Sequence, residues 1–129
     1  MARRGLQATL TLLGLVALVF GSLSVVFGGE LVLGAGTVSP SVDSELRYYA
    51  AWYAVAGVVA LRAALRVETE GRTIRALSAA LFLGGCGRVI SLIATGTPHP
   101  VSLVLIGLEL GLPLVLVPWQ ASLGRRRIG

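Results

Sequence analysis

The stretch that decides the fold is Leu6–Phe27, which reads LQATLTLLGLVALVFGSLSVVF and carries no charged residue. A helix of this length, at about 1.5 Å per residue, covers the roughly 30 Å hydrocarbon core of a bilayer. Arg3 and Arg4 precede the run, as they would in a signal peptide. The run is nevertheless long for a signal peptide, and no A-x-A-like cleavage site follows it. We therefore predict that it forms a first membrane-spanning helix.

The composition of the whole chain agrees with a membrane protein. Of 129 residues, 55% are hydrophobic and 13% are charged, and the mean hydropathy is +0.85. A soluble domain carries about 25% charged residues, and a disordered chain carries few apolar ones. These values exclude an ordinary soluble enzyme and a disordered protein. The lone cysteine, Cys86, excludes an intramolecular disulfide.

Three further apolar runs follow the first, and polar or Gly/Pro-rich connections separate them. The four expected helices cover residues of about 6–27, 45–65, 76–95 and 101–118. Ser39 and Pro40 are typical of a helix N-cap followed by proline in the first turn. The sequence therefore predicts an all-α fold, a four-transmembrane-helix bundle that forms a single integral membrane domain over residues 1–129.

The arginines predict the orientation of the bundle. They lie mostly in three segments: the N-terminus, the connection between the second and third runs, and the C-terminus. Under a four-span arrangement these segments share one side, and short cytoplasmic loops carry the excess of Lys and Arg. We expect both termini to be cytoplasmic. This also explains the net charge of +5 better than a nucleic-acid partner does.

Small residues predict where the helices approach one another, because close packing in lipid relies on them. Ala76, Ala80 and Gly84 share a stripe with Arg88 at i+4 spacing, so we expect this stripe to be packed. Similar sets on the first two helices are Gly14 with Gly21, Ala50 with Ala54 and Gly57, and Ala56 with Ala60. The alternative is a chance scatter of Ala and Gly.

The fourth run contains a G-x-x-x-G pattern at Gly107 and Gly111. Glu109 lies between the glycines, about 200° round the helix. If Glu109 faces the bundle, the glycine face points outward and is a candidate seat for a partner helix or a second copy of the chain. The alternative is that the first helix packs there.

Ionisable residues gather toward the expected outer half of the membrane. Arg88 and Glu109 both lie roughly 10–12 Å inside the outer boundary, so we expect them to pair across neighbouring helices. Near the outer surface are Asp43, Glu45, Arg47 and His99, and Asp43 can pair with Arg47 four residues on. One interpretation is a polar pocket for a lipid headgroup or a small amphipathic ligand. The other is an ion pair that only fixes helix register.

Other chemistries find no support in the sequence. His99, held between Pro98 and Pro100, is the sole histidine, and no second His or Cys is available for a zinc site. No nucleophile motif or phosphate-binding glycine loop is present. We expect no catalytic residues, no metal and no cofactor, and an enzyme is the less favoured interpretation.

Several stretches resemble a bacterial family of small four-helix integral membrane proteins of unknown function. They are Arg47-Tyr48-Tyr49, Trp52-Tyr53, Gly84–Ser91, Gly96–Pro100 and Glu109-Leu110 with Pro113 and Trp119. The resemblance covers about Asp43 to Gln120. It implies a four-helix membrane bundle, singles out Arg88, His99 and Glu109, and implies no activity.

Together these observations favour a multi-pass protein of a bacterial inner membrane with no enzymatic activity. Its expected role is that of an accessory or ligand-binding subunit, with membrane lipid and a larger membrane complex or a homo-oligomer as partners. The alternative is a transporter or isomerase-like enzyme that handles a lipid or small amphiphile of the outer leaflet. In it, Arg88 would anchor an anion and Glu109 would carry a proton.

Overall fold

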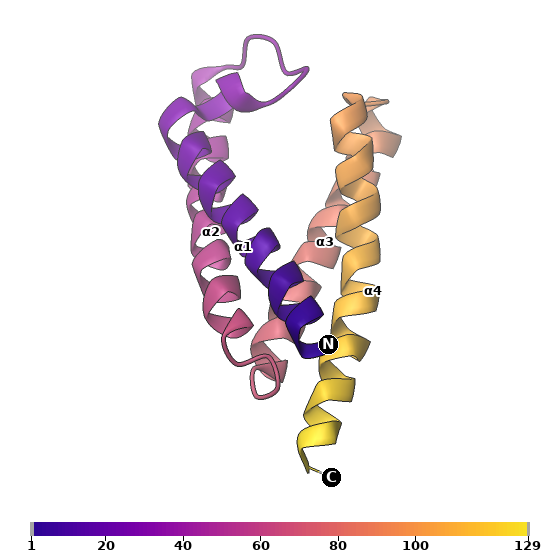
Figure 1. Ribbon diagram of the computed structural model, residues 1–129. Coiled ribbons are helices and arrows are strands. Elements are labelled where there is room, and N and C mark those ends of the chain that lie inside the picture. Colours follow the sequence, from indigo (N-terminus) through magenta and orange to yellow (C-terminus); the bar gives the residue numbers. More distant parts are fainter. Residues whose placement is uncertain (1, 129) are drawn as a thin grey trace. The chain divides into compact units, whose positions relative to one another are not determined.

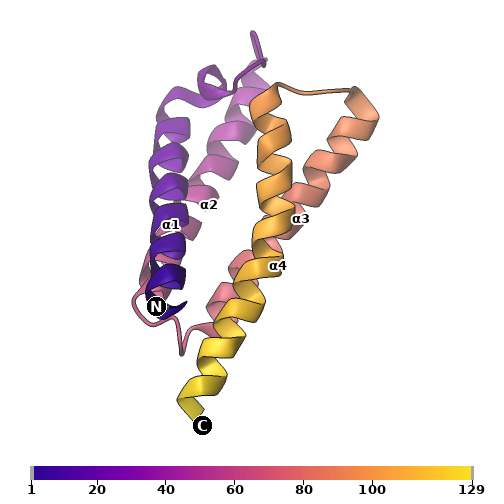
Figure 2. The ribbon, with the colours of Figure 1, turned by 45° about the vertical axis from the view of Figure 1, so that its right-hand side comes forward.

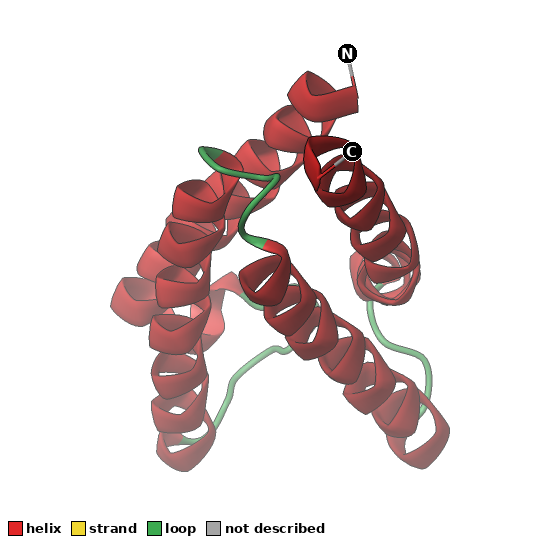
Figure 3. Ribbon diagram, turned by 90° about the horizontal axis from the view of Figure 1, so that it is seen from below, coloured by secondary structure: helices red, strands yellow, loops and turns green. Residues whose placement is uncertain are grey.

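The computed structural model describes residues 2–128, with side chains up to Arg126, and every long element in it is a helix. The elements are α1 (Ala2–Phe27), the short 3-10 helix η1 (Gly28–Leu31), α2 (Pro40–Ala64), α3 (Gly71–Thr95) and α4 (Pro100–Ile128) (Figure 1). Residues 2–128 contain no strand, as Figure 3 shows. The predicted all-α fold with four helices is confirmed. Met1 and Gly129, which the predicted domain includes, lie outside the described residues.

Three of the four long helices could cross a membrane. Within the described chain, Ala2–Leu31, Gly71–Thr95 and Pro100–Arg126 are long and apolar enough to do so. Helix α2 is not among them, because its first turns carry Asp43, Glu45 and Arg47 as well as a cluster of tyrosines and a tryptophan. The structure therefore supports three of the four predicted spans, and the fourth stays a prediction.

The chain divides into two compact units, which we describe one at a time. The α1–α2 unit is Ala8–Leu65. The α3–α4 unit consists of the residues up to Gln7 together with those from Arg66 onward, so it includes the first turn or so of α1.

Small residues bring the two helices of the α1–α2 unit into close contact, as the sequence predicted (Figure 1). A Cβ placed on Gly21 would lie 2.6 Å from the backbone N of Ala54, and one on Gly57 would lie 2.6 Å from the backbone N of Leu18. Gly14 faces Gly57 and Leu61 in the same way. Because the backbones nearly touch at these positions, no larger residue fits there without a shift of one helix.

Helix α2 begins where its sequence indicates. The Ser39 hydroxyl accepts a hydrogen bond from the backbone N–H of Val42 (3.3 Å), and Pro40 occupies the first turn. The proline has no N–H to leave unpaired at that position, so the two residues together favour a helix start there.

Helices α3 and α4 run antiparallel within their unit, joined by the residues from Gly96 to His99 (Figure 2). They approach closely at Gly85, where an added Cβ would lie 2.8 Å from Leu110 Cδ2 and 3.2 Å from Glu109 Cβ. The side chains that are essentially out of contact with solvent are Leu6, Val67 and Ile74. The core of this unit therefore lies where the start of α1 and the start of α3 meet the C-terminal half of α4.

The predicted packed stripe of α3 is wrong in register. Ala76, Ala80 and Gly84 are exposed, and nothing lies within 4 Å of a Cβ placed on Gly84. The buried positions are Ile74, Ser78 and Gly85. The error has a physical cause: α3 carries small residues on several faces, so their spacing alone does not distinguish the packed face from its neighbour.

Helix α4 continues well beyond the expected end of its span. Pro113 and Pro118 both lie inside the helix, which runs on to Ile128. Leu116, Gln120 and Leu123 are buried at helical spacing. The packed face thus extends past Pro118, and this burial holds the last turns in place although each proline removes a backbone hydrogen bond.

Candidate functional site

The ion pair predicted between Arg88 and Glu109 is present. Arg88 Nε donates to Glu109 Oε2 at 2.8 Å, which joins α3 to α4. The two helices approach closely at Gly85, which lies beside Glu109 and one turn before Arg88 on α3. The side chains of Arg88 and Glu109 therefore meet. Both residues lie inside helices that could cross a membrane, where an unpaired arginine costs about 2.5–3.5 kcal/mol on insertion scales.

The two partners differ in their surroundings. The side chain of Glu109 is 15% exposed and that of Arg88 is 43% exposed. A guanidinium has five N–H donors, and within the described chain Glu109 engages only the Nε–H of Arg88. The outward edge of Arg88 therefore remains available to another acceptor.

Asp43 and Arg47 form the second predicted pair, which ties α2 to the end of α1. Arg47 Nε donates to Asp43 Oδ2 at 2.7 Å, and the backbone N–H of Gly29 donates to Asp43 Oδ1 at 2.8 Å. Arg47 Nη1 also donates to the carbonyl oxygens of Val25 (2.9 Å) and Val26 (2.6 Å). The last carbonyls of a helix lack intrahelical partners, so Arg47 caps α1 from the neighbouring helix.

These donors change the acidity of Asp43. The hydrogen bond from Gly29 N–H, followed by that from Arg47, lowers the pKa of the Asp43 carboxyl below its ordinary value of 3.8. Gly28 gives the chain the turn that this arrangement needs, because its φ of +61° belongs to the left-handed region that favours glycine. The pair thus holds the start of α2 against the end of α1.

The remaining predicted site residues are both exposed. Glu45 makes no hydrogen bond or ion pair within the described chain. His99 caps α4: its Nδ1 accepts from the backbone N–H of Val101 at 3.2 Å, and its carbonyl accepts from Ser102 N–H at 2.8 Å. Among the described residues no group of three or more His, Cys, Asp or Glu side chains could hold a metal ion.

The structure brings the predicted site residues together as two separate pairs. Arg88 and Glu109 belong to the α3–α4 unit, whereas Asp43 and Arg47 belong to the α1–α2 unit. A common pocket for all of these residues stays a prediction.

The glycines of the predicted partner face are exposed. Nothing lies within 4 Å of a Cβ placed on Gly107 or on Gly111, while Glu109 between them contacts α3. Large apolar side chains surround these glycines on α4 and are exposed as well; they include Val104, Leu108 and Val115.

Comparison with known proteins places this arrangement in a family. A family model, described as a domain of unknown function (DUF4345), matches residues 5–120. The chain belongs to the DUF4345 family. The match contains every candidate site residue named above, and it confirms the resemblance to a small four-helix family of unknown function. No curated protein and no solved structure matches the chain.

Sequence reasoning missed two polar contacts of this DUF4345 chain. The buried side chain of Gln120 donates from Nε2 to the carbonyl of Val67 at 2.9 Å, which fixes the α2–α3 connection to α4. Arg3 forms an ion pair with Glu68 in the same connection. Gln120 is a single polar residue at the end of an apolar run, and this position could have indicated a buried hydrogen bond. The Arg3–Glu68 ion pair joins residues far apart in sequence, so no local pattern predicts it.

Proposed function

We propose that this DUF4345 protein is a small, non-enzymatic, four-span protein of a bacterial inner membrane with both termini in the cytoplasm. It acts as an accessory or ligand-binding subunit and docks on a larger membrane complex through its helix faces. The exposed glycine face of α4 supports this proposal most directly.

Membrane helices associate where their backbones can approach closely. Lipid is as apolar as leucine, so close backbone approach and van der Waals packing drive the contact. Gly107 and Gly111 leave the backbone of α4 open on the side opposite Glu109. The exposed side chains beside them, such as Val104 and Leu108, can interdigitate with a second helix. A partner helix that also carries small residues fits this face.

Photo-crosslinking in living cells tests the docking. A photoreactive residue at Leu108 should give an adduct of a single larger mass, whereas one at Ile93, exposed on α3, should not. Gly107→Leu combined with Gly111→Leu should remove the Leu108 adduct, because the new side chains fill the face. An adduct that survives this double substitution would contradict docking at the glycines. An adduct at twice the mass of the chain would show that the partner is a second copy of the chain and not a larger complex.

The available donors of Arg88 favour a second candidate function, a transporter or isomerase-like enzyme for a lipid or small amphiphile of the outer leaflet. There Arg88 would hold the anionic group and Glu109 would carry a proton. Glu109→Gln distinguishes the two functions, because glutamine can still accept a hydrogen bond from Arg88 but cannot bind and release a proton. An accessory subunit keeps its Leu108 adduct and its cellular role in this variant. A transporter or enzyme keeps the adduct and loses its activity.

A further inference from the structure

The excess positive charge of this protein is concentrated at one end of the α3–α4 unit. Seven exposed arginines gather there with two glutamates, Glu68 and Glu70, which leaves five positive charges. The whole chain has eleven arginines and six acidic residues, so this end holds most of the arginines and only two of the acidic residues. We call it the basic end, and its arginines are Arg3, Arg4, Arg66, Arg72, Arg75, Arg125 and Arg126.

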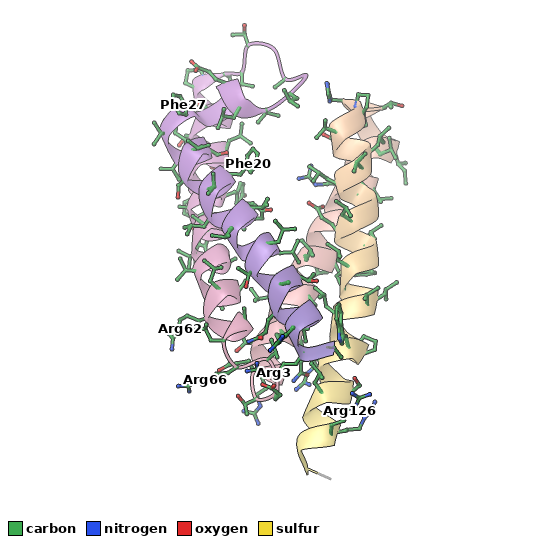
Figure 4. The ribbon with its side chains drawn as sticks, in the orientation of Figure 1. Arg3, Phe20, Phe27, Arg62, Arg66 and Arg126 are labelled. Carbon is green, nitrogen blue, oxygen red and sulfur yellow. The ribbon has the colours of Figure 1, made fainter. Side chains whose placement is uncertain are left out.

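Contacts within the unit bring the four segments of the basic end together. Arg3 pairs with Glu68, the Gln120 amide donates to the Val67 carbonyl, and the backbone at Gly124 lies beside the carbonyl of Glu68. The start of α1, the α2–α3 connection, the first turns of α3 and the last turns of α4 therefore form one surface. Figure 4 labels Arg3 on α1, Arg66 on the connection and Arg126 on α4.

The glutamates do not neutralise the surface. Of the seven arginines, Arg3 alone forms an ion pair within the described residues, and Glu70 accepts a hydrogen bond from the hydroxyl of Thr73 at 2.7 Å. The arginines also lie at the boundary of the apolar stretches, where those of α1 and α3 begin and that of α4 finishes. In a membrane this boundary is the depth of the lipid headgroups. Trp119, whose ring lies against Gly5, marks the same level.

We propose that the basic end binds the headgroups of anionic phospholipids. Arginine suits this role because its planar guanidinium can donate two parallel hydrogen bonds to a phosphate. Clusters of four to eight basic residues beside a membrane helix attract anionic lipid, and each contributes about a fivefold gain in affinity. This binding goes beyond the docking of α4 and does not depend on it, because the two surfaces use different residues.

The two tryptophans of the chain allow a direct test (Figure 2 shows α2 and α4, which carry them). In a Trp52→Phe background, Trp119 alone reports on the basic end. The full chain is reconstituted in mixed vesicles of phosphatidylglycerol and phosphatidylcholine, with bromine on the acyl chains of one lipid at a time. We expect brominated phosphatidylglycerol to quench Trp119 more strongly, so that its relative binding constant exceeds one. Added sodium chloride should lower this constant by screening.

Matched variants connect the preference to the arginines. Arg72→Gln with Arg75→Gln, and separately Arg125→Gln with Arg126→Gln, should lower the relative binding constant about fivefold per charge until it reaches one. Arg72→Lys with Arg75→Lys should retain most of the preference, because it keeps both charges. In a Trp119→Phe background, Trp52 in the α1–α2 unit should show no preference.

Four results would overturn the proposal. They are equal quenching of Trp119 by the two lipids, an unchanged preference in both glutamine pairs, and an equal preference reported by Trp52. The fourth is a preference abolished by inorganic phosphate but not by chloride of the same ionic strength, which would mean that the surface binds free phosphate.

Discussion

At the scale of single residues, Arg88 and Glu109 stay paired because either charge alone is unfavourable inside a membrane. An ion pair with good geometry offsets much of this unfavourable free energy. The two residues are not equivalent, because Glu109 is 15% exposed and Arg88 is 43% exposed. An unpaired Arg88 can turn its long side chain toward water or headgroups, whereas an unpaired Glu109 cannot.

This asymmetry gives a prediction about stability. Arg88→Gln should lower the free energy of unfolding by about 1–3 kcal/mol, because it leaves the charge of the largely buried Glu109 without its partner. Glu109→Gln should cost less. The double variant should cost less than the sum of the two, since neither charge is then left alone. Thermal unfolding in detergent measures all three. Strictly additive losses would mean that the pair contributes no coupling energy.

Asp43 gives a prediction about pH. Its carboxylate is held by Gly29 N–H and by Arg47, which lower its pKa in the folded chain below 3.8. As the pH falls, the unfolded chain binds the proton first, so Asp43 contributes stability above about pH 4 and loses it as the pH falls through the lowered pKa. The gap in melting temperature between the wild type and Asp43→Asn should therefore keep its full width above about pH 5 and narrow as the pH falls below about pH 4. A gap that stays constant from about pH 6 to well below about pH 4 would show that the carboxylate is not held in this way.

At the scale of helices, glycines decide how closely α1 and α2 approach. Gly21→Ala should destabilise the protein by about 1–3 kcal/mol, as overpacking does, because the new Cβ would lie 2.6 Å from the backbone of Ala54. Gly84→Ala is the matched control: it makes the same change inside a helix, with nothing within 4 Å of the new atom. Thermal unfolding should show a loss for the first variant and no loss for the second. Equal melting temperatures would contradict the close contact at Gly21.

Some features of these helices can be predicted from the sequence, and others depend on tertiary contacts. The helices themselves follow from apolar runs, and the Arg88–Glu109 pair follows from the cost of charges at matched depth. The packed face of α3 does not follow, because Gly84, Gly85 and Gly87 offer small residues in several directions and the side chains of α4 select Gly85. The capping of α1 by Arg47 is likewise a tertiary contact: its spacing from Asp43 predicts the ion pair but not the carbonyl acceptors on another helix.

At the scale of the whole molecule, the composition of α2 decides the path of the chain through the membrane. Helices α1, α3 and α4 are apolar enough to cross, whereas α2 carries charges and aromatic rings in its first turns. Its later part, from Ala54 to Leu61, is apolar, and Arg62 in its last turn can reach toward headgroups. The proposed orientation places all three arginine-rich segments in the cytoplasm, and this requires α2 to cross as well.

Three threonines distinguish four spans from three. Thr37, Thr69 and Thr97 are exposed and lie in the three successive connections. Each is changed to Cys in a Cys86→Ser background, and intact cells are treated with a membrane-impermeant maleimide. With four spans, the cysteines at 37 and 97 should react and the one at 69 should react only after permeabilisation. If α2 stays outside, positions 37 and 69 react together and position 97 is protected, because α3 then crosses in the opposite direction. That second pattern would contradict both the fourth span and a cytoplasmic C-terminus, since the arginines beside Thr69 would lie outside, against the charge rule that motivates the orientation.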